Sequence, residues 1–366
     1  MTASTPPFGD WVRPALRVLK PYASARSIDP DGTALVALDA NENPYPVDPD
    51  QPLNRYPDPQ PKSLVQALAS HYGVEADQLL ITRGSDEGID LLMRLFCQPD
   101  KDRIMVQSPC FGMYALYAQI QGAQVVDVPL IQGKTDWAVN WLQIEQAPEC
   151  RLYFFCSPNN PTGQCIDSLS LLTFAKQVQD TAVVVVDEAY IEFCDQDSLA
   201  SLVAHQPNIV VLRTLSKAFA LAGARLGAVV AHPDLIGWLK RIIAPYPLPT
   251  PSVDAALRAL RPEALEAQSA QLRQLSDNKQ ALIAALKGRP FVFDLWPGQA
   301  NFVLVRVDDA DRLMRHCLDR GIRLRNQSHQ ARLENCVRIT VGDNAQTKTL
   351  LEALDAYQPN PQSNIA

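Results

Sequence analysis

Two short apolar runs, each followed by polar residues, constrain the fold of this chain more than any other feature. Val183–Val186 is followed directly by Asp187. Ile209–Leu212 is followed within five residues by Ser216 and Lys217. Runs this short and this rich in β-branched residues predict strands that are buried on both faces, as in a parallel sheet. Because open α/β sheets bind ligands at the carboxyl ends of their strands, the two runs predict a crevice that holds one carboxylate and one amine.

Strand and helix patterns alternate between residues 62 and 231, which predicts an α/β domain with a mostly parallel sheet flanked by helices. The expected strands are 79–82, 104–107, 124–128, 152–156, 183–186, 209–212 and 226–231, and the expected helices are 63–71, 86–97, 112–120 and 168–179.

The chain is long enough for more than one domain. Ala244–Pro249 is rich in proline and interrupts the alternation. Beyond it, helix patterns at 263–287, 309–320 and 346–357 and strand patterns at 302–307 and 338–341 predict a smaller α+β domain. The proline-rich start, with one short strand pattern at Leu35–Leu38, predicts an arm that packs on the small domain or on a dimer partner. The expected division is 1–50 for the arm, 51–247 for the large domain and 248–366 for the small domain.

Composition narrows the class of protein. The net charge of −7 argues against nucleic acid or an acidic membrane surface as a partner. No apolar run approaches eighteen residues, and no signal-peptide pattern opens the chain, so a membrane span is not expected. The eight cysteines form no CxxC pair, which predicts reduced thiols in a cytoplasmic protein, and the five histidines have no metal-ligand spacing, so no metal site is expected.

The pair of Asp187 and Lys217 suits pyridoxal phosphate, whose aldehyde needs a lysine and whose ring nitrogen needs an anion. Each residue alone has an ordinary interpretation: a solvated surface lysine, and an aspartate that caps a helix or a turn. Thr214 and Ser216 beside the lysine, and Arg225 eight residues later, favour the phosphate dianion instead. The freed lysine amine would then move a proton at the substrate Cα.

Two further polar segments follow the carboxyl ends of predicted strands. Ser157–Gly163 has the composition of a tight turn, and it would also present the Asn160 amide to the crevice. Ser85 and Asp86 open a predicted helix, where they are either simple caps or a phosphate site made by free N–H groups.

These segments together resemble the signatures of fold-type-I, pyridoxal-phosphate-dependent aminotransferases. The resemblance rests on Ser157–Gly163, Asp187–Tyr190 and Ser216–Arg225. Further matches resemble the histidinol-phosphate aminotransferase family of histidine biosynthesis: Asn41–Pro44, Asn54–Pro57, Arg83–Gly88 and Val337–Gly342. The likeness runs from about residue 20 to residue 342.

The resemblance implies a role for each matching residue. Lys217 would bind the cofactor aldehyde, Asp187 its ring nitrogen, and Tyr190 and Asn160 its phenolic oxygen. Residues implied to bind the phosphate are Ser85, Asp86, Thr214, Ser216, Arg225 and, from across a homodimer, Tyr56. Phe111 would stack on the cofactor ring. The better-known residue at this position of the family is tyrosine, and phenylalanine offers the same kind of aromatic face. Residues implied to bind substrate are Arg338, Arg325, Tyr22 and Asn43. Buried core packing for Tyr190 and a surface salt bridge for Arg325 are the ordinary alternatives.

The family implies a cytoplasmic homodimer with shared active sites. It would pass an amino group between glutamate and imidazole acetol phosphate, giving 2-oxoglutarate and histidinol phosphate, in either direction. Two alternatives use the same fold: an aromatic aminotransferase, or a phosphothreonine decarboxylase. A nucleotide-binding or regulatory protein would be a third class, but no GxGxxG or Walker loop supports it.

Overall fold

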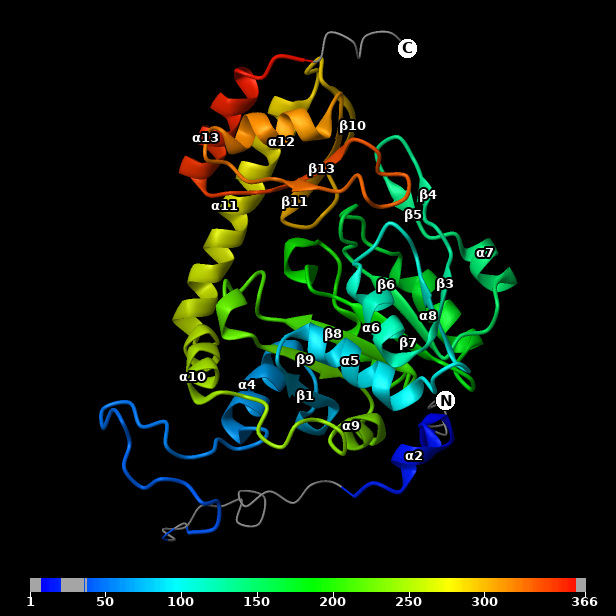
Figure 1. Ribbon diagram of the computed structural model, residues 1–366, viewed down its shortest axis with the longest axis vertical. Helices are drawn as coiled ribbons and strands as arrows, with labels where there is room; N and C mark the ends of the chain where they lie inside the picture. Colours follow the sequence, from blue (N-terminus) through cyan, green and yellow to red (C-terminus); the bar gives the residue numbers. More distant parts are fainter. Residues whose placement is uncertain (1–7, 21–35, 37, 360–366) are drawn as a thin grey trace.

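The computed structural model describes residues 8–20, 36 and 38–359. Its larger part is a seven-stranded sheet with helices on both faces (Figure 1). The strands lie in the order β1-β9-β8-β7-β6-β2-β3. Their bounds are β1 Leu79–Thr82, β2 Arg103–Val106, β3 Gln124–Asp127, β6 Leu152–Cys156, β7 Val183–Asp187, β8 Ile209–Thr214 and β9 Gly227–Val230. The expected α/β class is confirmed, and the strand expected at Leu35–Leu38 lies largely outside the described residues.

The central strands are buried on both faces, as their unbroken apolar runs predict. β3, β2, β6, β7 and β8 are parallel neighbours. Val184 and Val186 pack into the core on one face of the sheet, whereas Val183 and Val185 pack into the core on the other. Successive residues of a strand point to opposite faces, so four consecutive valines serve two cores. The parallel register brings the carboxyl ends of these strands to one edge.

The strand β9 departs from the parallel pattern. It pairs antiparallel with both β8 and β1. Parallel neighbours need a crossover of a dozen or more residues, usually a helix. The segment between β8 and β9 contains only a short 3-10 turn, η4 (Ala222–Ala224), so the chain returns beside the strand that it has just left. This return places Arg225 next to the end of β8.

Helices cover the two faces of the large sheet, and apolar spacing along each helix turns one side to it. The buried residues of α5, α6 and α9 belong to one core, and those of α4, α8 and α10 belong to the other. Their bounds are α4 Lys62–Tyr72, α5 Ser85–Phe96, α6 Met113–Gln121, α8 Ser168–Gln177, α9 Pro233–Leu239 and α10 Thr250–Ala259. Shorter helices are α1 Phe8–Trp11, α2 Pro14–Arg17 and α7 Trp141–Gln146.

A second, four-stranded sheet lies above the carboxyl edge of the large one (Figure 1). Its order is β10-β11-β13-β12, all antiparallel. The long helix α11 (Pro262–Leu286) leads from α10 up to this sheet. The other elements are β10 Val292–Trp296, β11 Phe302–Val307, α12 Ala310–Leu318, β12 Arg325–Asn326, β13 Cys336–Thr340 and α13 Asn344–Asp355. Of the elements in this list, β10 and β12 were not expected from the sequence. The domain boundary at 247/248 itself stays a prediction.

A hairpin joins the two sheets on one side. Its strands are β4 (Ile131–Gln132) and β5 (Trp137–Ala138). Trp137 packs with Trp296 of β10, at 5.5 Å between ring centroids, and the Trp296 indole N–H donates to the Gly133 carbonyl oxygen. The small sheet is thereby held over the large one by aromatic packing as well as by α11.

The segment between residues 38 and 60 extends away from the rest of the chain, at the lower left of Figure 1. It contains no helix or strand and several exposed apolar side chains, among them Leu38, Tyr45 and Leu53. None of the helices in the described part of the chain is long and apolar enough to cross a membrane.

Two helical glycines give a matched test of this packing. Gly88 of α5 lies against the sheet, where an added Cβ would come within 2.8 Å of Val229 Cγ2 and 3.0 Å of Leu212 Cδ2. Gly237 of α9 has no atom within 4 Å of that position. Gly88→Ala is expected to lower the free energy of unfolding by about 1–3 kcal/mol through overpacking. Gly237→Ala is expected to raise it by up to about 1 kcal/mol through helix propensity. Urea unfolding measures both; equal effects of the two changes would contradict this account of helix packing.

Candidate active site

A cavity of about 890 Å³ lies at the carboxyl edge of the large sheet, below the small one. It brings together residues from segments that lie far apart in the chain. Twelve of the fifteen predicted site residues line it: Ser85, Asp86, Phe111, Asn160, Asp187, Tyr190, Thr214, Ser216, Lys217, Arg225, Arg325 and Arg338. The parallel strands and the β8–β9 return account for this convergence.

Asp187 ends β7 and is buried. Its Oδ2 accepts a 2.7 Å hydrogen bond from the Tyr114 hydroxyl, and its Oδ1 accepts one from the Ala189 backbone N–H at 3.1 Å. Burial raises the pKa of Asp187 to about 6, against which these two hydrogen bonds act. No arginine or lysine in the described part of the chain forms an ion pair with it. The site therefore holds a buried carboxylate that a cationic ligand would stabilise.

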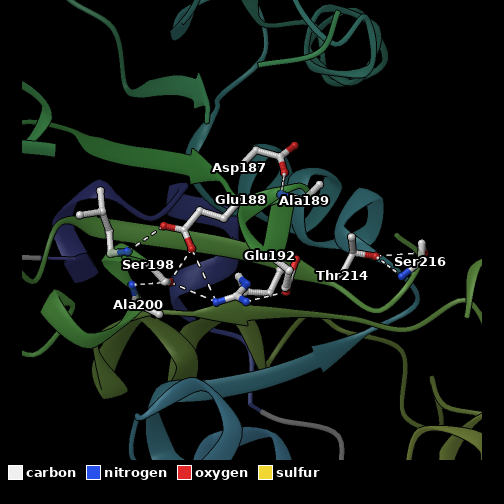
Figure 2. Close-up of polar contacts among 10 residues, drawn as sticks. Asp187, Glu188, Ala189, Glu192, Ser198, Ala200, Thr214 and Ser216 are labelled. Atoms are coloured by element: carbon white, nitrogen blue, oxygen red, sulfur yellow. Dashed lines mark hydrogen bonds and ion pairs between the residues drawn. The ribbon is translucent and has the colours of Figure 1, made fainter. Parts of the chain in front are cut away.

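The next residue, Glu188, points away from the cavity into a second buried network (Figure 2). Its carboxylate accepts hydrogen bonds from Ser198 Oγ and the Leu199 backbone N–H. Arg213 of β8 lies 3.7 Å from Glu188 and 2.7 Å from Glu192. Buried charges require such pairing, and removing one partner typically costs about 3–5 kcal/mol.

This network fixes the ends of the two strands on which the cavity depends. Glu188 follows Asp187 directly, and Arg213 precedes Thr214 directly. Since alternate residues of a strand face opposite ways, the charges that lock the strand ends lie on one side and the cavity residues on the other. In Figure 2, Asp187 and Glu188 point in opposite directions.

A cluster of donors forms an anion site at one end of the cavity. Arg225 Nη1 lies 3.4 Å from Ser216 Oγ, which is 3.0 Å from Thr214 Oγ1. The helix α5 begins at Ser85 without a side-chain cap, so its first N–H groups are available to a ligand. Capping, the ordinary interpretation of Ser85 and Asp86, is therefore not what the structure shows. A helix N-terminus beside an arginine and two hydroxyls suits a phosphate.

Glycine allows these parts to meet. A Cβ on Gly227 would come within 2.5 Å of the Gly84 carbonyl carbon and of the Ser85 backbone nitrogen. Gly84 itself has φ +78°, and a Cβ there would come within 2.7 Å of Arg225 Nη2. The close approach of β9 to the start of α5 thus requires Gly227 to lack a side chain, and the positive φ favours glycine at position 84.

Lys217 lines the same cavity as Asp187 and the donor cluster around Arg225. Burial, followed by the nearby charge of Arg338, lowers the pKa of its ammonium group. Its Nζ lies 5.5 Å from the centroid of the Tyr190 ring. A lowered pKa leaves more of the amine neutral, which is the form that attacks a carbonyl.

Two arginines of the small sheet enter the cavity from above. Arg338 of β13 and Arg325 of β12 are directly paired in the antiparallel register. Burial lowers the pKa of Arg338, and the charge of Arg325 lowers it further. Arg338 Nη1 donates to Asn160 Oδ1, but its buried Nε has no partner among the described residues. Like charges directly opposite one another destabilise a sheet, so this pair is suited to an anion between them.

Three predicted site residues do not line this cavity. Tyr56 lies in the extended segment, half-exposed and stacked on Tyr246 at 4.4 Å between ring centroids. Asn43 is exposed in the same segment, where its Oδ1 accepts from the Tyr45 backbone N–H. Tyr22 lies outside the described residues. Their roles stay predictions.

The structure adds Tyr114, which the sequence analysis did not single out. Tyr114 lies on α6, three residues after Phe111, and its ring stacks on Phe154 at 4.9 Å between centroids. An aromatic at helical spacing predicts only core packing, so the sequence carried no separate signal for its hydroxyl. Gln327 and His329 also line the cavity.

Comparison with known proteins agrees with this geometry. The model of the aminotransferase class I and II family matches residues 30–354. The chain belongs to the class I and II aminotransferases. A histidinol-phosphate aminotransferase of Cronobacter sakazakii is 42% identical over 346 residues, which cover 93% of this chain and 95% of that protein.

Solved structures share the aminotransferase fold. The histidinol-phosphate aminotransferase of Clostridium acetobutylicum has a TM-score of 0.76 at 22% identity, covering 83% of this chain and 90% of that one. That of Sinorhizobium meliloti, solved with pyridoxal 5'-phosphate, has a TM-score of 0.73 at 23% identity, covering 93% and 96%.

Class I and II aminotransferases depend on pyridoxal phosphate, and the cavity of this family member fits that cofactor. The buried carboxylate of Asp187, without a cation of its own, suits the protonated ring nitrogen. The donors around Arg225 suit the phosphate, and the amine of Lys217, with its lowered pKa, suits the aldehyde. Phe111 lines the same cavity and offers an aromatic face.

The hydroxyl of Tyr114 gives a pH-dependent test of this aminotransferase site. Asp187 has a higher pKa in the folded protein than in the unfolded chain. The free energy of unfolding therefore falls as pH rises, because Asp187 ionises more readily in the unfolded chain. In the cofactor-free protein, Tyr114→Phe is expected to lower the free energy of unfolding by about 2 kcal/mol at pH 8, where Asp187 is ionised and loses its donor. The difference is expected to shrink below pH 6, where Asp187 holds a proton. Urea unfolding at pH 5 and pH 8 measures this.

The control for Tyr114→Phe is Tyr117→Phe on the same helix. Tyr117 is half-buried and forms no side-chain hydrogen bond among the described residues. Its replacement is expected to have a small effect that does not change with pH. An effect of Tyr114→Phe that is equal at both pH values would show that the Asp187 contact does not stabilise the carboxylate.

Proposed function

We propose that this chain is a histidinol-phosphate transaminase. It transfers an amino group between histidinol phosphate and 2-oxoglutarate, giving imidazole acetol phosphate and glutamate, in histidine biosynthesis. The observation that carries the proposal is the half-buried Arg338, whose Nε has no partner among the described residues and which is paired in register with Arg325, over a cavity that also fits pyridoxal phosphate. The 42% identity to a curated histidinol-phosphate aminotransferase supports the same reaction.

The two arginines suit both substrates. Histidinol phosphate carries a phosphate and no carboxylate, whereas glutamate carries two carboxylates. A guanidinium group binds either anion through two parallel hydrogen bonds. The same two arginines can therefore bind the phosphate of histidinol phosphate in one half-reaction and a carboxylate of glutamate in the other.

The hydrogen bond from Arg338 to Asn160 connects this anion site to the cofactor site. Asn160 is held by a segment in which the Gly163 carbonyl oxygen accepts from the Gln299 backbone N–H. An anion that draws Arg338 into a new pair would leave the Asn160 amide free to turn. We infer that Asn160 and Tyr190 then bind the phenolic oxygen of the cofactor.

Bound pyridoxal phosphate supplies an electron sink that stabilises negative charge at the substrate Cα. The residues of this chain support that chemistry. Asp187 keeps the ring nitrogen protonated, because a buried carboxylate is stabilised by an adjacent cation. The Lys217 amine, with its lowered pKa, would accept the proton from the substrate Cα and act as the general base of the reaction. The N-terminus of α5 and Arg225 hold the phosphate still while the proton moves.

We further propose that the enzyme is a homodimer. The extended segment exposes the apolar side chains of Leu38, Tyr45, Val47 and Leu53, which a partner would cover. Tyr56 lies in the same segment and would reach the partner's cofactor phosphate. Within this proposal, residues 1–50 are the arm, 51–247 the large domain and 248–366 the small domain.

We place the enzyme in the cytoplasm, where thiols are kept reduced. All eight cysteines lie among the described residues and are free thiols. Structural disulfides are typical of oxidising compartments instead.

The absorbance of the cofactor-loaded enzyme tests which substrate it converts. Adding histidinol phosphate is expected to shift the cofactor from its aldehyde form to its amine form. The kcat/KM for histidinol phosphate is expected to exceed that for phenylalanine by at least about 100-fold, since the arginine–phosphate pairing contributes about 3 kcal/mol. Lys217→Ala should show no shift with any substrate. Faster turnover of phenylalanine, or release of carbon dioxide from phosphothreonine, would reject the proposed substrate in favour of a relative's reaction.

Arg338→Ala tests the anion site separately from the cofactor site. The kcat/KM is expected to fall by about 1000-fold for histidinol phosphate and for glutamate, because two charge-assisted hydrogen bonds are lost. Affinity for pyridoxal phosphate should change little. The matched control is Arg306→Ala on β11, whose side chain pairs with Asp294 and does not line the cavity. A parallel loss of cofactor affinity in Arg338→Ala would show that Arg338 belongs to the cofactor site.

A further inference from the structure

Two cysteines that are far apart in the sequence are in direct contact beside the active site. Cys165 Sγ lies 2.8 Å from Cys194 Sγ, across 29 positions of sequence. Both residues are half-buried, so small solutes can reach them. Cys165 also lines a second cavity of about 310 Å³. No other two thiols of the described residues form a hydrogen bond with each other.

The environment makes the two sulfurs unequal. Cys194 Sγ accepts a hydrogen bond from the Gln196 backbone N–H at 3.3 Å, whereas no backbone N–H of the described residues donates to Cys165 Sγ. Either sulfur can donate a hydrogen to the other, and the Gln196 N–H stabilises a thiolate at Cys194 in particular. Burial raises the pKa of the other six cysteines: Cys97, Cys110, Cys150, Cys156, Cys317 and Cys336. Cys194 is thus the thiol best prepared to act as a nucleophile, since the thiolate is the reactive form.

The pair joins two segments that bear active-site residues. Cys165 follows the Ser157–Gly163 turn, which carries Asn160. Cys194 follows the 3-10 turn η2 (Ile191–Phe193), which begins directly after Tyr190. A covalent bond there requires the sulfurs to move closer by less than about 1 Å, since a disulfide spans about 2.05 Å.

We propose that Cys165 and Cys194 form an oxidation site, which hydrogen peroxide converts to a disulfide. In the first step, the Cys194 thiolate attacks one peroxide oxygen, the O–O bond breaks, and the departing hydroxide takes up a proton as water. Cys194 is then a sulfenic acid. In the second step, Cys165 sulfur attacks Cys194 sulfur, the S–O bond breaks, and the departing hydroxide takes the Cys165 proton as a second water. Two thiols lose two electrons in total, and one peroxide gains them.

The test is peptide mapping of the cofactor-loaded enzyme after treatment with hydrogen peroxide, without a reducing agent. We expect one cross-linked peptide that joins Cys165 to Cys194, formed at least about ten times faster than oxidation of any other cysteine. A reducing agent should reverse the change. The cross-linked enzyme should also unfold at a temperature roughly 3 °C higher or more, because the bond restricts the unfolded chain.

Three variants make the result decisive. Cys165→Ser should stop at the sulfenic acid of Cys194, which a sulfenic-acid-selective label would trap. Cys194→Ser should leave Cys165 unmodified at the same peroxide dose. Cys317→Ser, a buried thiol of α12, should cross-link as the unchanged enzyme does. A cross-link between other cysteines, or equal oxidation of all eight thiols, would overturn the proposal. These readouts do not depend on transaminase activity, so the proposal can fail while the proposed function holds.

Discussion

The buried carboxylate of Asp187 is the constraint on which the rest of this structure depends. A carboxylate out of water is costly unless donors or a cation surround it. Here two hydrogen bonds, from Tyr114 and the Ala189 backbone, are not enough to restore an ordinary pKa, which stays raised to about 6. The large sheet therefore holds an acid that a protonated ring can stabilise. A bound cofactor would thus stabilise the fold as well as supply the chemistry.

The second buried network explains how such a site stays in place without a ligand. Glu188 and Arg213 connect the ends of β7 and β8 on the side away from the cavity. Glu192 pairs with Arg213, and Ser198 and the Leu199 backbone N–H donate to Glu188. Structural charges and functional charges thus alternate along the same two strands. The strand ends keep their positions, while Asp187 and Lys217 stay available to a ligand.

Much of the fold and of the site could be predicted because it depends on local patterns. Buried valine runs predict parallel strands, and polar residues just after them predict the cavity. The missing parts depend on long-range contacts. The β12–β13 pairing that places Arg325 opposite Arg338 involves only two residues of β12, too few for a pattern. Neither the Tyr114–Asp187 bond nor the contact between Cys165 and Cys194 has a local signature, since each joins positions that only the folded chain brings together.

The arginine pair in the cavity has a consequence for how anions reach it. The chain as a whole is negative, at −7, and so repels an approaching phosphate ester at long range. Within the cavity, Arg338 and Arg325 present two positive charges to a bound anion. At physiological ionic strength the screening length is about 8 Å, so dissolved salt weakens the long-range repulsion more than the short-range attraction to the half-buried Arg338. The association rate of a doubly charged metabolite is therefore expected to fall less with rising salt concentration than in an enzyme that attracts anions through its outer surface.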